Sequence, residues 1–255
     1  MRILKFTAIF LLMSNLAWGG INFDGTDDSV DGSGSLLTAV PITIAAWIYP
    51  ANTNANKVAV WLGDNGGAQW NAFYIIPSNN AKLSAVSANN NVFSGADSTS
   101  IYSANTWYHI CGVFASSMSR TIYFNGVNEV TNTTSSTPVG IDSFFIGKHG
   151  VTGGGSLMNG QITEVAIWNV ALTDAEVALL ASSRIKGIPL QVRPANLKLY
   201  YPMDDQSQGT SADGTTIRDY SGSGNNGLGN NGANNTGCLF AGESALSYPP
   251  SIIGD

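Results

Sequence analysis

Short apolar segments, each ended by glycine, proline, asparagine or serine, follow one another along this 255-residue chain. In the clearest of them, residues 42–49, alternation places four side chains on one face: Ile42, Ile44, Ala46 and Ile48. Comparable segments are predicted as strands at residues 57–62, 71–76, 82–88, 107–115, 120–125, 143–147, 161–168 and 196–201. Many short strands at regular spacing are typical of a sandwich or jelly roll, and they exclude alternating strand–helix–strand units.

One segment departs from the strand pattern and predicts a short helix. Thr173 and Glu176 have the spacing of a capping box, in which each side chain bonds the backbone N–H of the other residue. The apolar residues after them suit a helix that ends near Gly187. Asn125 and Gly126 are typical of a tight hairpin turn, whose two central residues need positive φ. We therefore expect an all-β fold, a two-sheet antiparallel jelly-roll sandwich with one short helix.

The N-terminus has the features of a cleavable signal peptide. A basic start precedes an apolar stretch at residues 6–16, and the small residues Ala17 and Gly19 stand at positions −3 and −1 of a cleavage site. The stretch is shorter than the roughly 20 residues that a membrane-spanning helix needs. We therefore expect removal of residues 1–19 and a single domain at residues 20–255. Such a protein would be secreted, extracellular or at the cell surface, without membrane insertion.

Charge and cysteine content narrow the classes of partner. The chain has 11 basic and 17 acidic residues, a formal net charge of −6. This excess of negative charge argues against nucleic acid and anionic membranes as partners. Cys111 and Cys238 are the two cysteines, and export would expose them to an oxidising compartment. Because no third cysteine competes, we expect them to form a disulfide.

Several blocks of sequence resemble the laminin-G-like jelly-roll domains, part of the concanavalin-A-like lectin and glucanase group. The blocks are Ile-Asn-Phe-Asp-Gly-Thr-Asp-Asp-Ser-Val at 21–30, the strand at 42–49, the hairpin segments at 107–111 and 121–127, and Asn-Gly-Gln-Ile-Thr-Glu-Val-Ala-Ile-Trp-Asn-Val-Ala-Leu-Thr at 159–173. The last block is the most specific, because strand, turn and capped helix occur together. His109 and Cys111 are also similar to the pentraxin signature. The resemblance covers residues 20–187.

The C-terminal segment leaves two arrangements open. Residues 197–204 and 219–227 resemble the sequence that normally precedes the first strand of these domains, yet here they follow the helix. Either residues 188–255 close the same sandwich in a permuted order, or they are a truncated second copy. A second copy would lack every later strand, so we expect one sandwich, closed by a last strand at residues 238–248. The Gly, Asn and Ser content after Met203 leaves a disordered tail as the alternative.

Catalysis is a hypothesis to test for this fold, because glycan hydrolases share it. Such enzymes need two carboxylates that flank the scissile bond. The glutamates are Glu129, Glu164, Glu176 and Glu243, and no predicted strand pairs one of them with a second acid on the same face. His109 lies within a predicted strand without an orienting partner and is expected to be structural. We therefore predict no catalytic residues and no enzymatic activity.

Tryptophans indicate where a ligand would stack. Three of them lie inside predicted strands and are expected to fill the space between the sheets: Trp47, Trp107 and Trp168. Trp70 instead lies in a turn that leads into a strand, so it is the tryptophan expected to be exposed and to stack on a sugar ring. Gln69 and Asn71 would bond the sugar hydroxyls, and His149 in a glycine-rich loop is a further candidate contact. A solvated loop side chain is the alternative for His149.

Two loop regions are rich in the oxygen ligands that Ca²⁺ prefers. The resemblance implies calcium as a structural ion in some members of the family without fixing its ligands. The candidate ligands in this chain are Asp24, Asp28, Asp219 and Asn225. The alternative is that these residues satisfy their own backbone through Asx-turns.

These observations predict a secreted, non-catalytic module that binds an extracellular carbohydrate or glycoprotein. The alternative is a structural or assembly protein of a cell or particle surface, which self-associates through the sandwich, and a glycan hydrolase ranks third. Sugar binding predicts exposed aromatic side chains in a hollow. Assembly predicts a contiguous apolar patch or an unpaired edge strand. The fold alone does not decide between them, because one fold hosts many functions.

Overall fold

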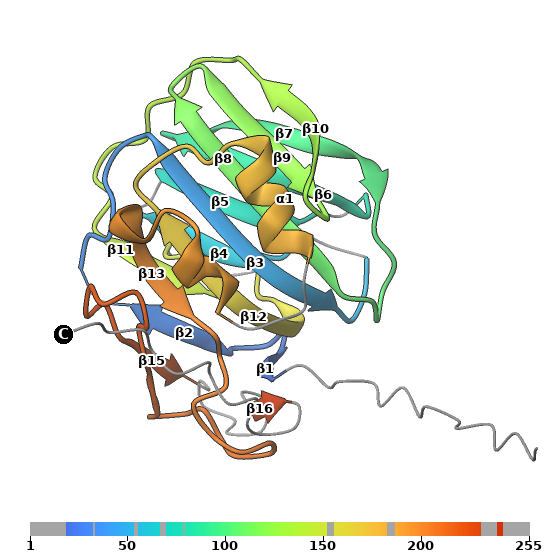
Figure 1. Cartoon of the computed structure of the whole chain (residues 1–255), viewed down its shortest axis with the longest axis vertical. Helices are drawn as coiled ribbons and strands as arrows, with labels where there is room; N and C mark the ends of the chain where they lie inside the picture. The colour runs from blue at the N-terminus through green and yellow to red at the C-terminus, as the bar shows by residue number, and fades with distance from the viewer. Residues whose placement is uncertain are drawn as a thin grey trace, which may run out of the picture.

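The computed structural model describes residues 19–230, apart from 33, 54–55, 67–69, 79, 152–155 and 183–186, together with the backbone of residues 239–241. Within these residues the chain forms two antiparallel sheets packed face to face, with one α-helix against the first sheet (Figure 1). The predicted jelly-roll sandwich with a short helix is therefore confirmed. The expected signal peptide, up to residue 18, lies outside the described residues.

Each sheet has eight strands in the described part of the chain. The first sheet has the order β10 (Val127–Asn132), β9 (Ser119–Phe124), β8 (Tyr108–Ser116), β3 (Ile42–Pro50), β12 (Asn159–Trp168), β1 (Gly20–Asp24) and β16 (Leu239–Ala241), and β13 (Leu197–Tyr201) also pairs with β12. The second sheet has the order β14 (Thr216–Ile217), β15 (Gly227–Asn230), β2 (Ser29–Gly32), β11 (Ser143–Ile146), β4 (Val60–Gly63), β5 (Ala72–Pro77), β6 (Lys82–Asn89) and β7 (Val92–Ile101).

Between β12 and β13 the chain forms α1 (Asp174–Ser182) and two 3₁₀ turns, η1 (Ile188–Gln191) and η2 (Pro194–Asn196). None of the described helices is long and apolar enough to cross a membrane. The predicted capping box is confirmed, because Thr173 N donates to Glu176 Oε2 at 2.8 Å and Glu176 N donates to Thr173 Oγ1 at 3.3 Å. The predicted hairpin turn between β9 and β10 is also confirmed, with φ of 50° at Asn125 and 82° at Gly126.

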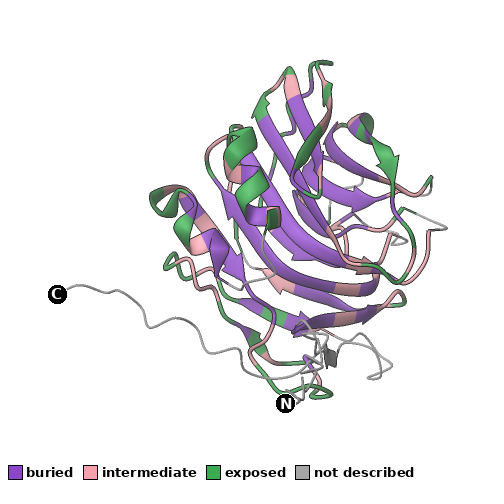
Figure 2. Cartoon of the chain, turned by 45° about the vertical axis from the view of Figure 1, so that its right-hand side comes forward, coloured by how far each residue is buried: buried purple, intermediate pink, exposed green. Residues whose placement is uncertain are grey.

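Every second side chain of the strands points into the core between the two sheets. The four side chains predicted to share one face of β3 are fully buried in this layer: Ile42, Ile44, Ala46 and Ile48. Phe144 of β11 fills the space over Gly32 of β2, where an added Cβ would lie 2.0 Å from the ring. Burying one such large apolar side chain contributes roughly 1.5–3 kcal/mol, so this layer is the main source of stability. Figure 2 shows buried residues along the middle of the strands and exposed residues on the outer side of α1.

A second apolar cluster lies on the other face of the first sheet, beneath α1. It contains Trp168 and Tyr200, both fully buried, together with Val177 and Leu180 of the helix. The indole Nε1 of Trp168 donates to the carbonyl oxygen of Val192 at 2.7 Å. Trp168 is therefore a core residue, but of this outer layer.

Trp47 and Trp107 also lie outside the core between the sheets. The ring of Trp47 packs against His109 and that of Trp107 against Tyr49, each with ring centroids 5.4 Å apart. The expectation that the three strand tryptophans fill the space between the sheets is thus wrong. Trp47 alternates with the buried isoleucines of β3, so its side chain points to the opposite face.

The C-terminal part of the chain contributes strands to both sheets. β13 pairs with the second half of β12, whereas β1 pairs with the first half. β15 pairs with β2, and β16 pairs with β1. Of the expected last strand at residues 238–248, the structure describes Leu239–Ala241.

β7, at one edge of the second sheet, has no counterpart among the predicted strands. Its inward side chains are small: Ser94, Ala96 and Ser98. The apolar alternation that marks a buried strand is therefore missing from its sequence. Beside its pairing with β6, β7 is held by Glu129 of β10, whose carboxylate accepts hydrogen bonds from Thr99 and Ser100. This contact joins the two sheets along one side of the sandwich.

Candidate functional site

A cavity of about 460 Å³ opens on the outer face of the second sheet. Alternate residues of β5, β6 and β7 point into it, because the side chains of a strand alternate between the two faces. The lining residues come from these strands and the adjoining loops: Asn56, Val58, Trp70, Tyr74, Ile76, Ser78, Asn80, Ser84, Val86, Phe93, Gly95, Asp97 and Ser156. A hollow of this size, lined by aromatic and aliphatic side chains together with polar ones, is large enough for a small-molecule ligand.

The floor of the cavity is mostly apolar and its rim is mostly polar. Buried side chains form the floor, and most of them are apolar: Val58, Tyr74, Ile76, Ser84 and Val86. Exposed polar side chains stand at the rim: Asn56, Asn80 and Asp97. This arrangement suits a ligand that has both an apolar face and hydrogen-bonding groups.

Trp70 stands in the cavity wall among three other rings. Its ring centroid lies 5.6 Å from that of Phe93, 5.5 Å from Tyr74 and 4.4 Å from His149. Phe93 is 54% exposed, whereas Tyr74 is buried. Burial raises the pKa of the Tyr74 hydroxyl, so this group stays protonated at neutral pH. Phe93 is therefore the ring that is most available to a ligand.

Two asparagines fix the aromatic cluster to the hairpin between β6 and β7. Asn90 and Asn91 form the hairpin turn, with φ of 52° and 63°. Asn91 accepts a hydrogen bond from Trp70 N at its Oδ1 (2.7 Å) and donates its own N–H to Trp70 O (3.2 Å). Asn71 Oδ1 accepts a hydrogen bond from Asn90 N at 2.9 Å. These bonds hold the hairpin that carries Phe93 beside Trp70.

The four predicted ligand contacts have different places in this arrangement. Trp70 lines the cavity, whereas Asn71 is buried and its side chain supports the hairpin turn. His149 packs on Trp70, and its Nδ1 accepts a hydrogen bond from Val151 N at 3.2 Å. Burial lowers the pKa of His149, so its ring is neutral at physiological pH. Gln69 lies outside the described residues.

Ser84, Phe93 and Asp97 are among the lining residues that were not predicted as contacts. Two of them belong to β7, the strand that has no apolar alternation. In the sequence, the one feature that points to β7 is Phe93, an aromatic residue shortly after two asparagines that could form a turn. This feature indicates a ligand contact only when the structure shows that β5, β6 and β7 are neighbouring strands.

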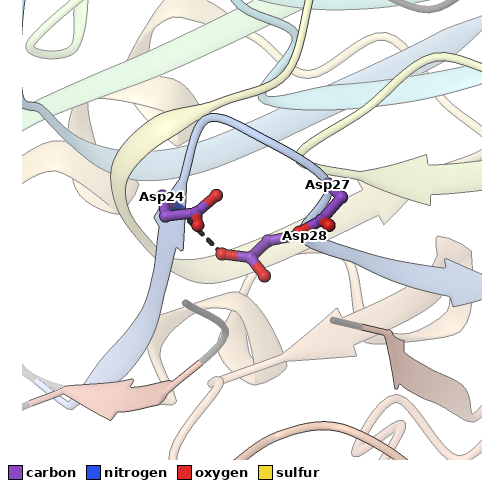
Figure 3. Close-up of side chains that lie close together, drawn as sticks. All are labelled: Asp24, Asp27 and Asp28. Atoms are coloured by element: carbon purple, nitrogen blue, oxygen red, sulfur yellow. Dashed lines mark hydrogen bonds between the residues drawn. The ribbon is translucent and has the colours of Figure 1, made fainter. Parts of the chain in front are cut away.

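The loop between β1 and β2 brings together three carboxylates, those of Asp24, Asp27 and Asp28 (Figure 3). One oxygen of each lies within 4.8 Å of the others. Asp24 N donates to Asp28 Oδ2 at 2.7 Å, and Thr26 N donates to Asp24 Oδ1 at 2.7 Å. Gly25 has a φ of 83°, a conformation that favours glycine in this tight loop.

Asp28 is the buried member of this group. Its side chain is fully buried, and Oδ1 has no hydrogen-bond partner among the described residues. Burial raises the pKa of Asp28 to about 6; the Asp24 N–H opposes this rise, and the charges of Asp24 and Asp27 add to it. A buried carboxylate oxygen without a donor is costly unless a proton or a cation compensates its charge. Three carboxylates around such an oxygen fit a hard cation such as Ca²⁺.

The other two predicted metal ligands, Asp219 and Asn225, make hydrogen bonds within the turn between β14 and β15 and to β13. Asp219 Oδ1 accepts hydrogen bonds from Tyr200 N and Ser221 N, and Oδ2 accepts them from Ser221 Oγ and Asn225 N, all at 2.9 Å. Asn225 Nδ2 donates to a β13 carbonyl oxygen at 2.8 Å. The group of three carboxylates in the described residues thus contains Asp27 and does not include Asp219. Asp219 has the backbone-satisfying role of an Asx-turn residue.

Cys111 lies in β8, fully buried in the cluster beneath α1. Burial raises the pKa of its thiol. Cys238 lies outside the described residues, so the disulfide between the two stays a prediction. Leu239, the residue after Cys238, pairs with Asn22 of β1. Two strands, β3 and β12, therefore lie between β1 and β8, the strand that contains Cys111.

Two antiparallel sheets packed face to face define a jelly-roll sandwich, an architecture found in lectin domains. Residues 24–178 match the Laminin_G_3 family, described as the concanavalin A-like lectin/glucanases superfamily, and the chain belongs to this family. The resemblance found in the sequence is therefore confirmed. No curated protein matches the chain.

Solved structures share the fold at low sequence identity. A provisionally assigned carbohydrate-binding protein from Bacteroides ovatus has a TM-score of 0.58 and 22% identity over 84% of this chain, and the chain covers 58% of that protein. The CBM40 domain of the Ruminococcus gnavus IT-sialidase, bound to alpha2,3 sialyllactose, has a TM-score of 0.53 and 15% identity, with coverage of 64% of this chain and 95% of the domain. A leech intramolecular trans-sialidase has a TM-score of 0.51 and 16% identity, with coverage of 66% and 29%.

Proposed function

We propose that this protein is a secreted, non-catalytic module that binds extracellular carbohydrate, free or on a glycoprotein, in the cavity on the second sheet. The observation that carries the proposal is the exposed Phe93 ring beside Trp70, within one cavity that also presents amides and hydroxyls at its rim. A sugar ring has an apolar C–H face and a border of hydroxyls. An aromatic wall with polar groups around it complements both features.

Two of the solved structures support this class of ligand. One is described as carbohydrate binding, and the other was solved with a bound sialyllactose. Their identities of 22% and 15% restrict this support to the class of ligand and do not extend it to a particular sugar. The N-terminal sequence supports an extracellular location, where carbohydrate is abundant.

The single carboxylate among the described lining residues supports binding without cleavage. Asp97 is the one acidic side chain among the described lining residues. Glycoside hydrolases of the usual kind need an acid and a second carboxylate that flank the scissile bond. The leech trans-sialidase shows that enzymes also contain this fold, so the proposal rests on the residues of the cavity rather than on the fold.

A glycan array followed by calorimetry on the best ligand tests the proposal. Phe93→Ala should weaken binding at least tenfold, because one stacked ring is lost. Ile101→Ala is the matched control, since Ile101 is an exposed apolar residue of the same strand that does not line the cavity. Gly95→Leu should block the cavity and still fold, because a Cβ at Gly95 makes only ordinary contacts at 3.5 Å with Asp97 and Val86.

Three results would contradict the proposal. The first is a glycan that binds equally well to the wild type and to Gly95→Leu, since the cavity would then play no part. The second is sustained release of reducing ends from any polysaccharide tested, which would show an enzyme. The third is concentration-dependent self-association that Phe93→Ala abolishes, with no glycan bound, which would favour the assembly protein.

We also propose that Ca²⁺ binds the loop of Asp24, Asp27 and Asp28 and stabilises the connection between β1 and β2. The observation in its favour is the buried Asp28 Oδ1, which lacks a hydrogen-bond donor among the described residues. A ligand that binds only the folded state raises the free energy of unfolding by ~2.7 kcal/mol at a hundredfold excess over Kd. The role is structural, because the loop contributes no residue to the cavity lining.

Thermal melting in millimolar Ca²⁺ and in EDTA tests this proposal. The wild type should melt higher with Ca²⁺, and Asp27→Asn should reduce the difference. Asp64→Asn, which changes a carboxylate outside this loop, should keep it. Identical melting curves in Ca²⁺ and EDTA for the wild type would remove the site.

A further inference from the structure

The described lining residues of the cavity include an acidic side chain but no basic one. Among its described lining residues Asp97 is the one ionisable carboxylate, and the others are apolar, amide- or hydroxyl-bearing. No lysine, arginine or histidine is among them. The short segments outside the described residues between strands β3 and β12 contain no charged residue in the sequence either: 54–55, 67–69, 79 and 152–155. A ligand in this cavity therefore meets a negative charge that no lining cation neutralises.

Asp97 is held in a defined place on this face. It lies opposite Ser84 across the β6–β7 pair, and Ser84 Oγ donates to its Oδ1 at 2.6 Å. Ser84 is buried in the floor, whereas Asp97 is exposed at the rim. An ionised carboxylate has about four acceptor positions, so one bond from Ser84 leaves capacity for further donors from a ligand.

We infer that the cavity selects uncharged sugars over acidic ones, and that Asp97 is the residue that determines this specificity. The inference rests on the proposed carbohydrate function and adds the charge class of the ligand. Neighbouring hydroxyls of a neutral sugar donate to Asp97, and hydrogen bonds to a charged acceptor are stronger than neutral ones. A uronic or sialic acid would bring a second carboxylate near Asp97, where like charges repel.

Lys57 and Lys82 are next or close to lining residues in the chain, but neither lines the cavity, and Lys82 provides a check. Lys82 precedes Ser84 by two residues on β6, pairs with Ile101 and does not line the cavity. If its side chain neutralised Asp97, the selection against acids would be lost. Lys82→Ala should therefore leave the preference for neutral sugars intact or increase it.

The experiment measures the affinities of matched neutral and acidic ligands for the wild type and Asp97→Asn. Suitable pairs are lactose with 3′-sialyllactose, and galacto- with galacturono-oligosaccharides. The wild type should bind the neutral member at least tenfold more tightly. Asp97→Asn should lose about tenfold in affinity for the neutral member and reduce the preference severalfold, and Asp64→Asn should do neither. Raising the salt concentration should also reduce the preference of the wild type, because salt screens the repulsion.

The outcomes separate this inference from the proposed function. The inference is overturned if the acidic ligands bind the wild type as tightly as the neutral ones. If Gly95→Leu also loses this binding, the proposed carbohydrate function of the cavity still holds. A preference that survives unchanged in folded Asp97→Asn, as judged by circular dichroism and melting, overturns the role of Asp97. Absence of binding to every neutral and acidic glycan overturns both.

Discussion

Replacing Glu129 by glutamine tests how the two sheets are joined along one side. Glu129 Oε2 accepts hydrogen bonds from Thr99 N at 2.9 Å, from Thr99 Oγ1 and from Ser100 N at 3.1 Å, and Oε1 accepts one from Ser100 Oγ at 2.6 Å. Glutamine keeps the size of the side chain but removes the charge and one acceptor. Hydrogen bonds to a charged group contribute more than neutral ones. After a discount for the solvent around this site, the expected loss is about 1–2 kcal/mol.

The same contact predicts a dependence on pH. Partial burial alone would raise the pKa of Glu129, but the hydrogen bonds from Ser100 and Thr99 outweigh it and hold the pKa at about 2. An unfolded glutamate has a pKa near 4.3, so the folded state holds the lower value. The stabilisation is therefore complete above about pH 5 and is lost as the pH falls toward 2.

Urea unfolding of the wild type and Glu129→Gln at pH 7 and at pH 3 measures both effects. The difference in free energy of unfolding should be about 1–2 kcal/mol at pH 7 and clearly smaller at pH 3. For a chain of this size such a difference corresponds to roughly 2–8 °C in Tm. Asp213→Asn, which changes an exposed carboxylate in a turn, is the control. Equal stabilities of wild type and variant at pH 7, or a difference that grows toward pH 3, would refute the reasoning.

Four further predictions concern packing, capping, the metal loop and the thiols. Gly32→Ala should lower the free energy of unfolding by about 1–3 kcal/mol, because its Cβ would overlap the ring 2.0 Å away; an unchanged urea midpoint would contradict this. Thr173→Ala should cost about 1 kcal/mol through loss of the cap, and Thr173→Ser should restore most of it. Calcium affinity should rise as the pH increases through about 6, since Asp28 must lose its proton to bind the ion; a calcium titration at pH 5 and 7 decides this. Cys111 should resist labelling in the folded protein, and a disulfide with Cys238 predicts no free thiol after unfolding without reductant, so two labelled thiols there would exclude it.

Those parts of the fold that depend on local pattern were predictable from the sequence. The alternation at residues 42–49 fixes which side chains of β3 face the other sheet, because a strand has only two faces. The cap of α1 needs two residues at one spacing, Thr173 and Glu176, and both make the predicted bonds. Trp47 shows the limit of residue-type reasoning. A large ring suggests a position in the core between the sheets. Trp47, however, alternates with the core residues Ala46 and Ile48 along β3, so its ring lies on the outer face of the first sheet.

The candidate site was predictable only at Trp70. Its other members meet through strand pairing, which places Ser84 of β6 opposite Asp97 of β7, and the sequence of β7 does not mark it as a strand. The metal loop shows a similar limit. Asp24 and Asp28 are close in the chain and meet, whereas Asp219 is far along the chain and its hydrogen bonds lie within its own turn and β13.

The pairing of early and late strands has a consequence for how the chain reaches its native state. β1, β2 and the second half of β12 pair with β16, β15 and β13, respectively, and these three partner strands all begin at or after residue 197. Contacts between such distant parts of a chain slow folding, because a long loop must close before they form. Until then β2 and half of β12 present unpaired backbone groups, which are templates for pairing with another chain. A ribosome-bound fragment that ends after α1 would therefore depend on chaperones, whereas the completed chain closes these edges with its own last strands.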